Sequence, residues 1–459
     1  MKHRLTLVLP LLFPIAAAAQ NTPEQKRFHA IYKELVETNT THSAGDTTLA
    51  ARRVARHLRE AGFAESDIQI IEPFPKKGNL VLRIKGDGTK KPLLLLAHLD
   101  VVEANRSDWQ TDPFVLQETN GYFTARGSID DKAMAASFVS IVSQLKREGF
   151  KPKRDIILAL TADEERGDVP ENGVFWLVKN RRELLDAEIG LNEGGRGELK
   201  NGKPVLNQVQ VAEKMYTTYV LTVKNPGGHS SLPDPDNAIY TLAEALGRIA
   251  QHKFKPNVGE VTREYFARSA PLTSDEGAAR DMRAVGIGEA TDAQIERLSK
   301  SNFYNAQLHT TCVATRVQAG HADNALPQTA TATVNCRILP NDDPVAIDKE
   351  LRSVIGPKVE VKATNPPLVS KASALRKDVI GPIEEITKEM WGVPVIPSMS
   401  TGATDSRFLR NLGMQIYGVS GMFVDINDYR AHGLDERITQ KALYDGREFL
   451  YRLVKRIAQ

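Results

Sequence analysis

One continuous apolar run constrains the fold of this chain more than any other feature. It spans Leu93 to Val102, reads LLLLAHLDVV, and is followed by polar residues. Such a run is typical of a β-strand that is covered on both faces of a sheet. Helical and strand-like segments alternate after it, with a predicted helix at 131–148 and predicted strands at 155–161 and 187–191. This alternation predicts an α/β fold with a mainly parallel sheet and helices on both faces.

A second pattern begins after about Val211. Strands and helices then follow in the order β-α-β-β-α-β, which is the order of a ferredoxin-like α+β domain. A polar segment with helical periodicity, at roughly 253–300, interrupts this order before its second strand. The predicted strands span 216–224, 310–317, 329–338 and 359–364, and the predicted helices span about 236–250 and 344–354.

The return of α/β character near the C-terminus indicates that the ferredoxin-like segment is a small domain inserted into a larger one. The predicted larger domain comprises residues 20–211 and 366–459, and the predicted inserted domain comprises residues 212–365. Residues 1–19 have the basic start, apolar run and small-residue end of a secretory signal peptide. We therefore expect an exported protein, periplasmic or secreted, and not a membrane anchor, since the apolar run is shorter than the ~20 residues of a span.

The composition excludes several classes of protein. Lys and Arg together count 60 and Asp and Glu 57, a balance that argues against nucleic-acid binding. No later segment is long and apolar enough for a stable membrane span. With two cysteines, a metal site would have to use His and carboxylate ligands. Cys312 and Cys336 lie on the two predicted strands that flank 319–328, a placement compatible with a disulfide or with two buried free thiols.

Acidic and histidine side chains follow the predicted buried strands. Because functional groups in open α/β sheets gather at the carboxyl ends of strands, we expect these side chains to meet there. Neighbouring carboxylates raise each other's pKa, and a divalent metal ion removes this repulsion. Imidazole and carboxylate ligands suit zinc, and two zinc ions about 3.5–4 Å apart can share one carboxylate. The candidates are His98, Asp100, Asp130, Asp131, Asp163, Glu164, Glu165, Glu193 and His432.

Motifs spread over most of the chain resemble those of one enzyme family, in the same order. They are LLLLAHLDVV, ARGSIDDKA, TADEERG, LNEGG, NPGGHSSLPDPDNAI, NALPQTATATVNCRILP, STGATDSR and AHGLDERI. The family is that of the zinc-dependent exopeptidases and amidohydrolases aminoacylase, carboxypeptidase G, carboxypeptidase S and succinyl-diaminopimelate desuccinylase. The resemblance implies a zinc-exopeptidase-like catalytic domain, an inserted lid and dimerisation domain, a homodimer, and two Zn²⁺ ions per subunit, with Co²⁺ or Mn²⁺ as alternatives.

The resemblance also implies roles for individual residues. Asp100 would orient a histidine ligand, and Glu164 would be the general base. Because Glu164 and Glu165 are adjacent, the reverse assignment of these two stays open. The peptide bond between Asp130 and Asp131 is expected to be cis. The expected ligands are His98, Asp130 and Glu193 for one zinc ion, and Asp130, Glu165 and His432 for the other.

The inserted domain is expected to contribute to the site as well. His229 resembles the lid histidine that stabilises the oxyanion, often from the partner subunit, and a loop-capping role is its alternative. For Arg407, a substrate contact and a surface salt bridge are equal alternatives. The segment at about 253–300 is expected either to narrow the substrate entrance or to be a solvent-exposed surface segment without a role at the site. The predicted substrate contacts are Asn324, Arg337, Gly402, Thr404 and Arg407.

The implied reaction is hydrolysis of an amide bond next to a free carboxylate. The favoured substrate is a dipeptide or the C-terminal residue of a small peptide, attacked by metal-activated water with Glu164 as base. Hydrolysis of an N-acyl amino acid is the nearest alternative, because the same site serves both reactions. A catalytically inactive peptide-binding protein is the alternative from another class, and the presence of a base beside the ligands argues against it.

Overall fold

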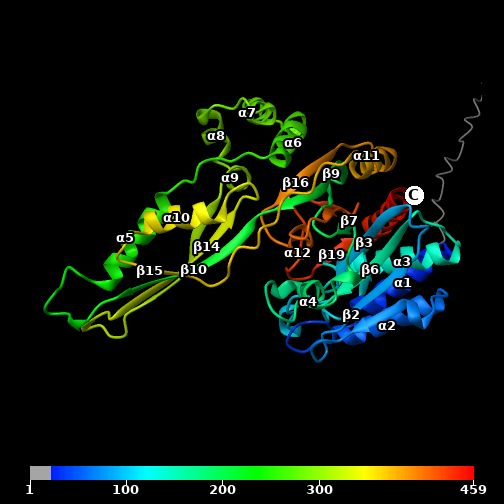
Figure 1. Cartoon of the computed structure of the whole chain (residues 1–459), viewed down its shortest axis with the longest axis horizontal. Helices are drawn as coiled ribbons and strands as arrows, with labels where there is room; N and C mark the ends of the chain where they lie inside the picture. The colour runs from blue at the N-terminus through cyan, green and yellow to red at the C-terminus, as the bar shows by residue number, and fades with distance from the viewer. Residues whose placement is uncertain (1–21) are drawn as a thin grey trace, which may run out of the picture.

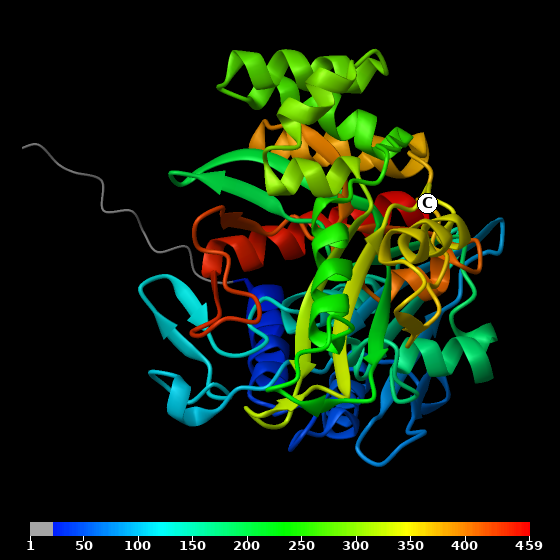
Figure 2. The ribbon, with the colours of Figure 1, turned by 90° about the vertical axis from the view of Figure 1, so that its left-hand side faces the viewer.

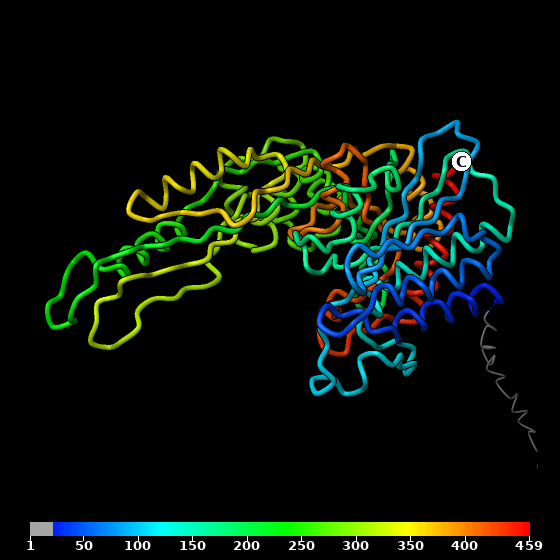
Figure 3. The backbone as a smooth tube through the Cα atoms, turned by 60° about the horizontal axis from the view of Figure 1, so that its bottom comes forward, coloured from blue at the N-terminus to red at the C-terminus, as the bar shows by residue number. Residues whose placement is uncertain are grey.

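The computed structural model describes residues 22–459 and shows a catalytic domain with an elongated lid that extends from it (Figure 1). The predicted signal peptide at 1–19 lies outside these residues. In the described part of the chain, no helix has the length and apolarity needed to cross a membrane. The lid comes from the middle of the sequence, and both flanking parts of the chain build the catalytic domain (Figures 1 and 3).

The catalytic domain contains a 10-stranded mixed sheet whose central pairs are parallel. β3 (Lys90–His98) pairs in parallel with β6 (Arg154–Thr161) and with β7 (Ile189–Asn192), and β7 pairs in parallel with β17 (Gln415–Gly418). This confirms the predicted α/β class. The outer strands are β1 (Ile68–Ile71), β2 (Asn79–Ile84), β8 (Gly197–Lys200), β9 (Lys203–Glu213), β16 (Val395–Ser400) and β18 (Phe423–Asp425).

Alternate residues of β3 face two separate apolar cores. Leu93 and Leu95 belong to the core on one side of the sheet, which we call the α3 face, and Leu94 and Leu96 belong to the core on the other side, the α4 face. Burial on both sides explains why the strand has no polar alternation. The α3 face is covered by α1 (Pro23–Val36), α2 (Thr47–Glu60), α3 (Lys132–Arg147), α11 (Lys377–Trp391) and α13 (Gln440–Ala458), and the α4 face by α4 (Gly173–Asn180) and α12 (Ser406–Arg410).

The hairpin of β8 and β9 was absent from the predicted elements. Its turn contains Asn201 and Gly202, both with positive φ (53° and 72°), as a tight hairpin turn requires. β9 carries buried polar side chains among its apolar ones. Asn207, for example, is fully buried and donates to the hydroxyl of Thr387 at 2.9 Å. Its partner lies on α11, far along the chain, so the sequence alone does not show that this polar side chain is buried.

The lid has the predicted ferredoxin-like topology. Its antiparallel sheet has the order β12-β14-β10-β15, and α5 (Ala238–Gln251) and α10 (Pro344–Ile355) contribute to its apolar core. Cys312 and Cys336 are direct partners in neighbouring strands, and a disulfide joins them, with a Cα–Cα distance of 4.0 Å. The four strands are β10 (Met215–Lys224), β12 (Thr311–Ala319), β14 (Thr329–Ile338) and β15 (Glu360–Ala363).

The segment predicted to be a helical insert forms α6 (Glu260–Ser269), α7 (Glu276–Ile287) and α8 (Asp292–Leu298), followed by α9 (Asn302–Leu308). These helices have a small apolar core of their own. α6 packs against β16, and Arg268 forms an ion pair with Glu384 of α11 at 2.6 Å. The insert therefore rests on the outer edge of the catalytic domain (Figures 1 and 2).

Candidate active site

Three of the five predicted metal ligands lie at the carboxyl ends of the central strands. His98 is the last residue of β3, Glu165 lies in the 3₁₀ turn after β6, and Glu193 follows β7. The next residue after Glu193 is Gly194, with φ of 111°, and a Cβ there would lie 2.4 Å from Oε1 of Gln210. Glycine is therefore required at this position, where the chain turns directly after Glu193.

Asp130 lies between the two histidines. Its Oδ1 is 3.2 Å from Nε2 of His98, and its Oδ2 is 3.1 Å from Nε2 of His432. A second carboxylate stands beside each histidine: Oε1 of Glu193 is 3.9 Å from His98 Nε2, and Oε1 of Glu165 is 2.9 Å from His432 Nε2. Each oxygen of Asp130 thus faces one pair of a histidine and a carboxylate, as in a site where one carboxylate bridges two cations. The bond between Asp130 and Asp131 is cis.

This donor set fits divalent metal ions. Ligand atoms of His98, Asp130 and Glu165 lie within 4.8 Å of one another, and so do those of His98, Glu164 and Glu193. Burial, followed by the charge of Glu164, raises the pKa of Glu193 well above its usual range, and burial also raises the pKa of Glu165. Hydrogen bonds to Asp130 and Glu165 raise the pKa of His432 to about 10. Such a concentration of negative charge is compensated when a cation binds.

Asp100 connects the His98 ligand to the loop that carries the predicted base. Nδ1 of His98 is 3.0 Å from the backbone oxygen of Asp100, and because a carbonyl only accepts, Nδ1 carries the proton. Nε2 is then free to bind a metal ion. The carboxylate of Asp100 accepts the backbone N–H groups of Glu164 and Glu165, each at 3.1 Å. Asp100 thus contacts His98 through its carbonyl and holds the turn of Glu164 and Glu165 through its carboxylate.

Glu436 is a positioning residue that the sequence analysis missed. It is completely buried, four residues after His432, and forms an ion pair with Arg126 at 2.7 Å. Its carboxylate also accepts the backbone N–H groups of Ile129 at 2.9 Å and Asp130 at 3.1 Å. Glu436 therefore couples the His432 segment to the loop of the central ligand Asp130. Its place close to His432 in the sequence could have indicated this role, but only the fold shows that the Glu436 side chain is buried.

Glu164 lies among the ligands without facing His432 as Glu165 does. Burial, followed by the charge of Asp405, raises the pKa of Glu164 well above its usual range. The residue before it, Asp163, has φ of 55°, in the left-handed region, and accepts a hydrogen bond from Nζ of Lys77 at 2.6 Å. This buried contact holds the strained turn that presents Glu164.

The lid residues His229 and Asn324 lie far from this cluster within one chain. His229 pairs with Ala325 in a short two-stranded ladder, and the backbone of Ser230 donates to that of Asn324 at 2.9 Å. The segments that carry them, 225–237 and 319–329, form the end of the lid farthest from the catalytic domain (Figures 1 and 3). His229 is exposed there.

Two of the predicted substrate contacts lie at the junction of the two domains. Arg407 of α12 is buried, and its Nη2 is 3.1 Å from Oδ1 of Asp168. Arg337 of β14 and Arg407 both stack on the ring of Tyr216, at 5.1 and 5.6 Å, and the Tyr216 hydroxyl donates to Asp168. Arg407 is therefore an interdomain contact rather than a surface salt bridge.

Thr404 and Gly402 lie in the loop before α12. Thr404 is buried, and its backbone N–H and its hydroxyl both donate to Glu213, at 2.7 and 3.1 Å. Glu213 also pairs with the buried Arg410 at 2.9 Å. Gly402 is exposed. The structure thus gives Thr404 a buried partner in its own chain, and Gly402 is the more accessible of the two.

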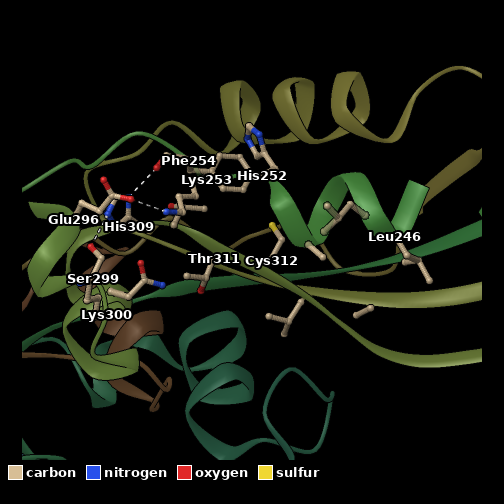
Figure 4. A pocket seen from close by; sticks show the side chains of 16 residues that line it. Leu246, His252, Lys253, Phe254, Glu296, Ser299, Lys300, His309, Thr311 and Cys312 are labelled. Carbon is tan, nitrogen blue, oxygen red and sulfur yellow. Dashed lines mark hydrogen bonds and ion pairs between the residues drawn. The ribbon is translucent and has the colours of Figure 1, made fainter. Parts of the chain in front are cut away.

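A large cavity of the described chain lies outside this cluster. It has a volume of about 650 Å³ and lies in the lid between α5, β12 and the helical insert (Figure 4). Leu246, Phe254 and Cys312 line it, together with Lys253 and Glu296, and none of its lining residues is a predicted ligand. Cavity size alone would therefore have pointed away from the catalytic centre.

Comparisons with known proteins identify the class of enzyme. A sequence profile of peptidase family M20/M25/M40 matches residues 94–456, and the chain belongs to this family. It is 30% identical over 374 residues to the N-fatty-acyl-amino acid synthase/hydrolase PM20D1 of Xenopus tropicalis, covering 79% of this chain and 72% of that protein. It is 29% identical to the probable carboxypeptidase S-like 2 of Dictyostelium discoideum, covering 97% of this chain and 91% of the relative.

Solved structures share the fold at low sequence identity. The M20 family metallo-carboxypeptidase Sso-CP2 of Sulfolobus solfataricus has a TM-score of 0.67 at 18% identity, covering 94% of this chain and 99% of that chain. The YXEP protein of Bacillus subtilis, described as a dinuclear metal-binding peptidase, has a TM-score of 0.61 at 13% identity, covering 94% of this chain and 98% of that chain. Family membership confirms the predicted hydrolytic enzyme of the metallopeptidase type.

Proposed function

We propose that this protein is a two-zinc exopeptidase that cleaves the amide bond of a dipeptide or of the C-terminal residue of a small peptide. The observation that carries this proposal is the position of Asp130, with one oxygen toward His98 and Glu193 and the other toward His432 and Glu165. Two imidazoles and three carboxylates are a donor set that suits zinc. Co²⁺ or Mn²⁺ would fit the same ligands.

The chain's own residues account for the proton transfers of such a reaction. Bound cations would supply a water of lowered pKa and would polarise the carbonyl of the scissile amide. Glu164 accepts the proton of the attacking water and then donates it to the departing amine. Burial raises the pKa of Glu164 well above its usual range in the metal-free site, and bound cations would lower this pKa again. The carboxylate of Asp100 holds Glu164 by accepting a hydrogen bond from the backbone N–H of Glu164.

Hydrolysis of N-acyl amino acids is the second candidate. It is favoured by the similarity to N-fatty-acyl-amino acid synthase/hydrolase PM20D1, which covers most of both chains. In both reactions the bond cleaved is an amide next to a free carboxylate. The arginines at the domain junction, Arg337 and Arg407, are the proposed partners of this carboxylate, since a guanidinium binds a carboxylate through two parallel hydrogen bonds. Asn324 and Gly402 are the further proposed substrate contacts.

We propose that the active unit is a homodimer joined through the lid. The outer strand β12 has a free edge, and its Val313 and Val317 are 56% and 68% exposed. An exposed edge strand of this kind pairs readily with a second copy. Within one chain the segment 225–237, which carries His229, lies at the end of the lid farthest from the catalytic domain (Figure 1). A second subunit would bring His229 to the site as a donor to the developing oxyanion.

Export to the periplasm or outside the cell is proposed from the signal-peptide pattern of residues 1–19. The disulfide between Cys312 and Cys336 is of the kind that persists in an oxidising compartment and supports the same proposal. N-terminal sequencing of the protein recovered from the exported fraction would test cleavage after Ala19.

A substrate screen tests the proposed activity. The protein is loaded with zinc, its metal content is measured, and dipeptides and N-acyl amino acids with the same C-terminal residues are offered in parallel. We expect about two zinc ions per chain, as a bridged site holds, and release of the free amino acid. Faster hydrolysis of the N-acyl series would favour the second candidate, and metal binding without any hydrolysis would favour a peptide-binding protein.

A further inference from the structure

The helical insert belongs to the lid by its chain connections and to the catalytic domain by its packing. It follows α5 and precedes β12, so both of its ends continue into the lid. Val261 of α6, however, belongs to the α3-face core of the catalytic domain. Arg268, besides its ion pair with Glu384, donates to the backbone oxygen of Val395 in β16 at 3.1 Å. The insert thus bridges the two domains (Figures 1 and 2).

The lid side of the insert is less tightly packed than its catalytic side. The cavity of about 650 Å³ lies between the insert and the lid elements α5 and β12 (Figure 4). Leu246 of α5 and Cys312 of β12 line it from the lid, and Glu296 and Ser299 line it from the insert. On the catalytic side, α6 packs directly against β16. The body of the insert is therefore fixed to the catalytic domain rather than to the lid sheet.

One residue, Lys214, separates the catalytic strand β9 from the lid strand β10. β9 ends at Glu213, and β10 begins at Met215. The backbone N–H of Lys214 donates to the carbonyl of Ser400, the last residue of β16, at 3.0 Å. Lys214 is therefore the hinge between the domains at this crossing, and its backbone is held by the catalytic domain.

The side chain of Lys214 is buried and connects the hinge to the insert. Its Nζ donates to the carbonyl of Ala306 at 3.0 Å and to that of His309 at 2.7 Å. Both carbonyls lie at the C-terminal end of α9, where helix carbonyls lack intrahelical partners and attract a cation. Gln307 of the same helix donates from its Nε2 to the carbonyl of Met399 in β16 at 3.0 Å. These hydrogen bonds fasten the end of the insert to the hinge and to the catalytic sheet.

The lid is a long lever that starts at Lys214. β10 has 10 residues and is about 33 Å long at about 3.3 Å per residue. A rotation of about 10° at the hinge would displace the far end of this strand by about 6 Å. His229 lies beyond that end, and a displacement of a catalytic group by about 1 Å can lower a rate about 100-fold. The lid therefore holds His229 at a defined position only if its hinge is fixed.

We propose that Lys214 is a positioning residue that, together with the helical insert, fixes the angle between the lid and the catalytic domain. The lid then presents segment 225–237 to the partner subunit at one set position, without a rotation about Lys214 in each reaction cycle. This inference rests on the proposed function, in which His229 acts in a second copy of this chain. It gives the insert a role at the hinge.

A substitution at the hinge tests the role of Lys214. Lys214→Met removes the donors of the ammonium group and keeps an unbranched side chain of similar length. We expect kcat of the zinc-loaded protein, measured on the amide that the wild type cleaves fastest, to fall by at least about 10-fold, with metal content unchanged. Lys253→Met is the matched control, because Lys253 lies in the same insert with a side chain that is 75% exposed and pairs only with the exposed Glu296. It should keep the wild-type kcat.

A covalent bridge between the insert and the catalytic domain separates positioning from general stabilisation. Both cysteines of the chain form the disulfide, so Arg268→Cys and Glu384→Cys introduce a single pair of free thiols that a bismaleimide can join. The cross-linked protein should keep the kcat of the same variant before cross-linking within about twofold. In the Lys214→Met background, the same cross-link should restore most of the lost kcat.

Hydrogen exchange gives a readout that needs no turnover. The backbone amides of segment 210–216 should exchange faster in Lys214→Met than in the wild type, because the hinge opens locally more often. Lys253→Met should leave this exchange unchanged. If Lys214→Met does not fold, the cross-linked protein with Lys214 intact still tests whether the angle is fixed.

The outcomes separate this inference from the proposed function. Loss of activity on cross-linking would show that the insert leaves the catalytic domain in each cycle, and would overturn the fixed angle. Wild-type kcat in Lys214→Met, or a loss that the cross-link does not restore, would overturn the role of Lys214 and leave the exopeptidase intact. If the zinc-loaded wild type cleaves no amide, the proposed function itself fails, and the hydrogen-exchange comparison still tests the hinge.

Discussion

The ligand cluster of the catalytic domain and the far end of the lid differ in how they are held. At the cluster, Asp100 and Glu436 are buried carboxylates that each fix backbone groups of a ligand-bearing loop. At the far end of the lid, His229 is exposed, and its ring contacts the hydroxyl of the neighbouring Ser231 at 2.8 Å. The ligand cluster is prearranged within the chain, whereas the far end of the lid is supported mainly by contacts within its own loop.

This difference indicates that the two regions become functional in different ways. A metal site needs its ligands in place before the ion binds, because separated ligands would have to be ordered at the cost of affinity. A group that stabilises a transition state can arrive with a moving domain or with a second subunit, since it acts only once the substrate is bound. The following predictions test this division.

The largest expected effect is at Glu164. Glu164→Ala should lower kcat by roughly 10²–10⁴-fold, as loss of an acid–base group does, while both metal ions stay bound. Glu171→Ala, in the same loop but outside the ligand cluster, is the control. Turnover and metal content are measured together. If the metal content falls and activity survives, Glu164 is a ligand, and the roles of Glu164 and Glu165 are reversed.

His229 should act from the partner subunit. His229→Ala is expected to lower kcat by about 10²–10³-fold, the effect of losing one oxyanion donor. When inactive His229→Ala and Glu164→Ala proteins are mixed and exchange subunits, one site in each mixed dimer is complete, and about a quarter of wild-type activity should return. The mixture is assayed before and after exchange. A fully active monomer, or no recovery in verified mixed dimers, would contradict the assignment.

Removal of the Glu436 carboxylate should affect the prearranged region far more than an equivalent change in the lid. Glu436→Gln leaves Arg126 buried without its anion and should cost about 3–5 kcal/mol of unfolding free energy. Zinc affinity should fall about 10- to 100-fold, because the loop of Asp130 loses its support. The lid control is Asp348→Asn, which breaks an exposed pair with Arg352 and should cost less than about 1 kcal/mol. Equal costs in denaturant titrations would show that the two regions are held alike.

The smallest predicted effect is the pH dependence of the metal's contribution to stability. In the metal-free protein, burial raises the pKa of Glu193 and Glu165, and contacts with carboxylates raise the pKa of His432 to about 10. A raised folded-state pKa stabilises the protein below the unfolded-state value, and this stabilisation is lost as pH rises through the folded-state value. The metal-free protein should therefore lose stability from about pH 5 to pH 9.

Zinc removes this loss because it binds the deprotonated carboxylates and the neutral histidine. The difference in Tm between zinc-loaded and chelator-treated protein should thus widen by a few °C as pH rises over this range. Thermal unfolding at several pH values measures it. A difference that is constant or shrinks with pH would show that these ligands do not control the charge of the metal-free site.

The sequence alone was sufficient for the features that depend on chain order and local pattern. The apolar run of β3 has no polar alternation because it packs on both faces, so it identified the central sheet. The β-α-β-β-α-β order identified the ferredoxin-like lid, since topology follows element order closely in so small a domain. Strand ends in a parallel sheet share one edge, and this rule predicts that His98, Glu165 and Glu193 lie together.

The tertiary structure decided everything that depends on which distant segments become neighbours. Asn207 of β9 is buried because Thr387, on a helix far along the chain, accepts its hydrogen bond, and only the fold shows this pairing. Glu436 is an ordinary acidic residue in the sequence and a buried support of Asp130 in the fold. Arg196 is one arginine among many in the sequence, and only the structure shows that it stacks on Tyr429 beside the ligands Asp130 and Glu193. Burial and pairing are properties of three-dimensional neighbours, and local periodicity does not contain them.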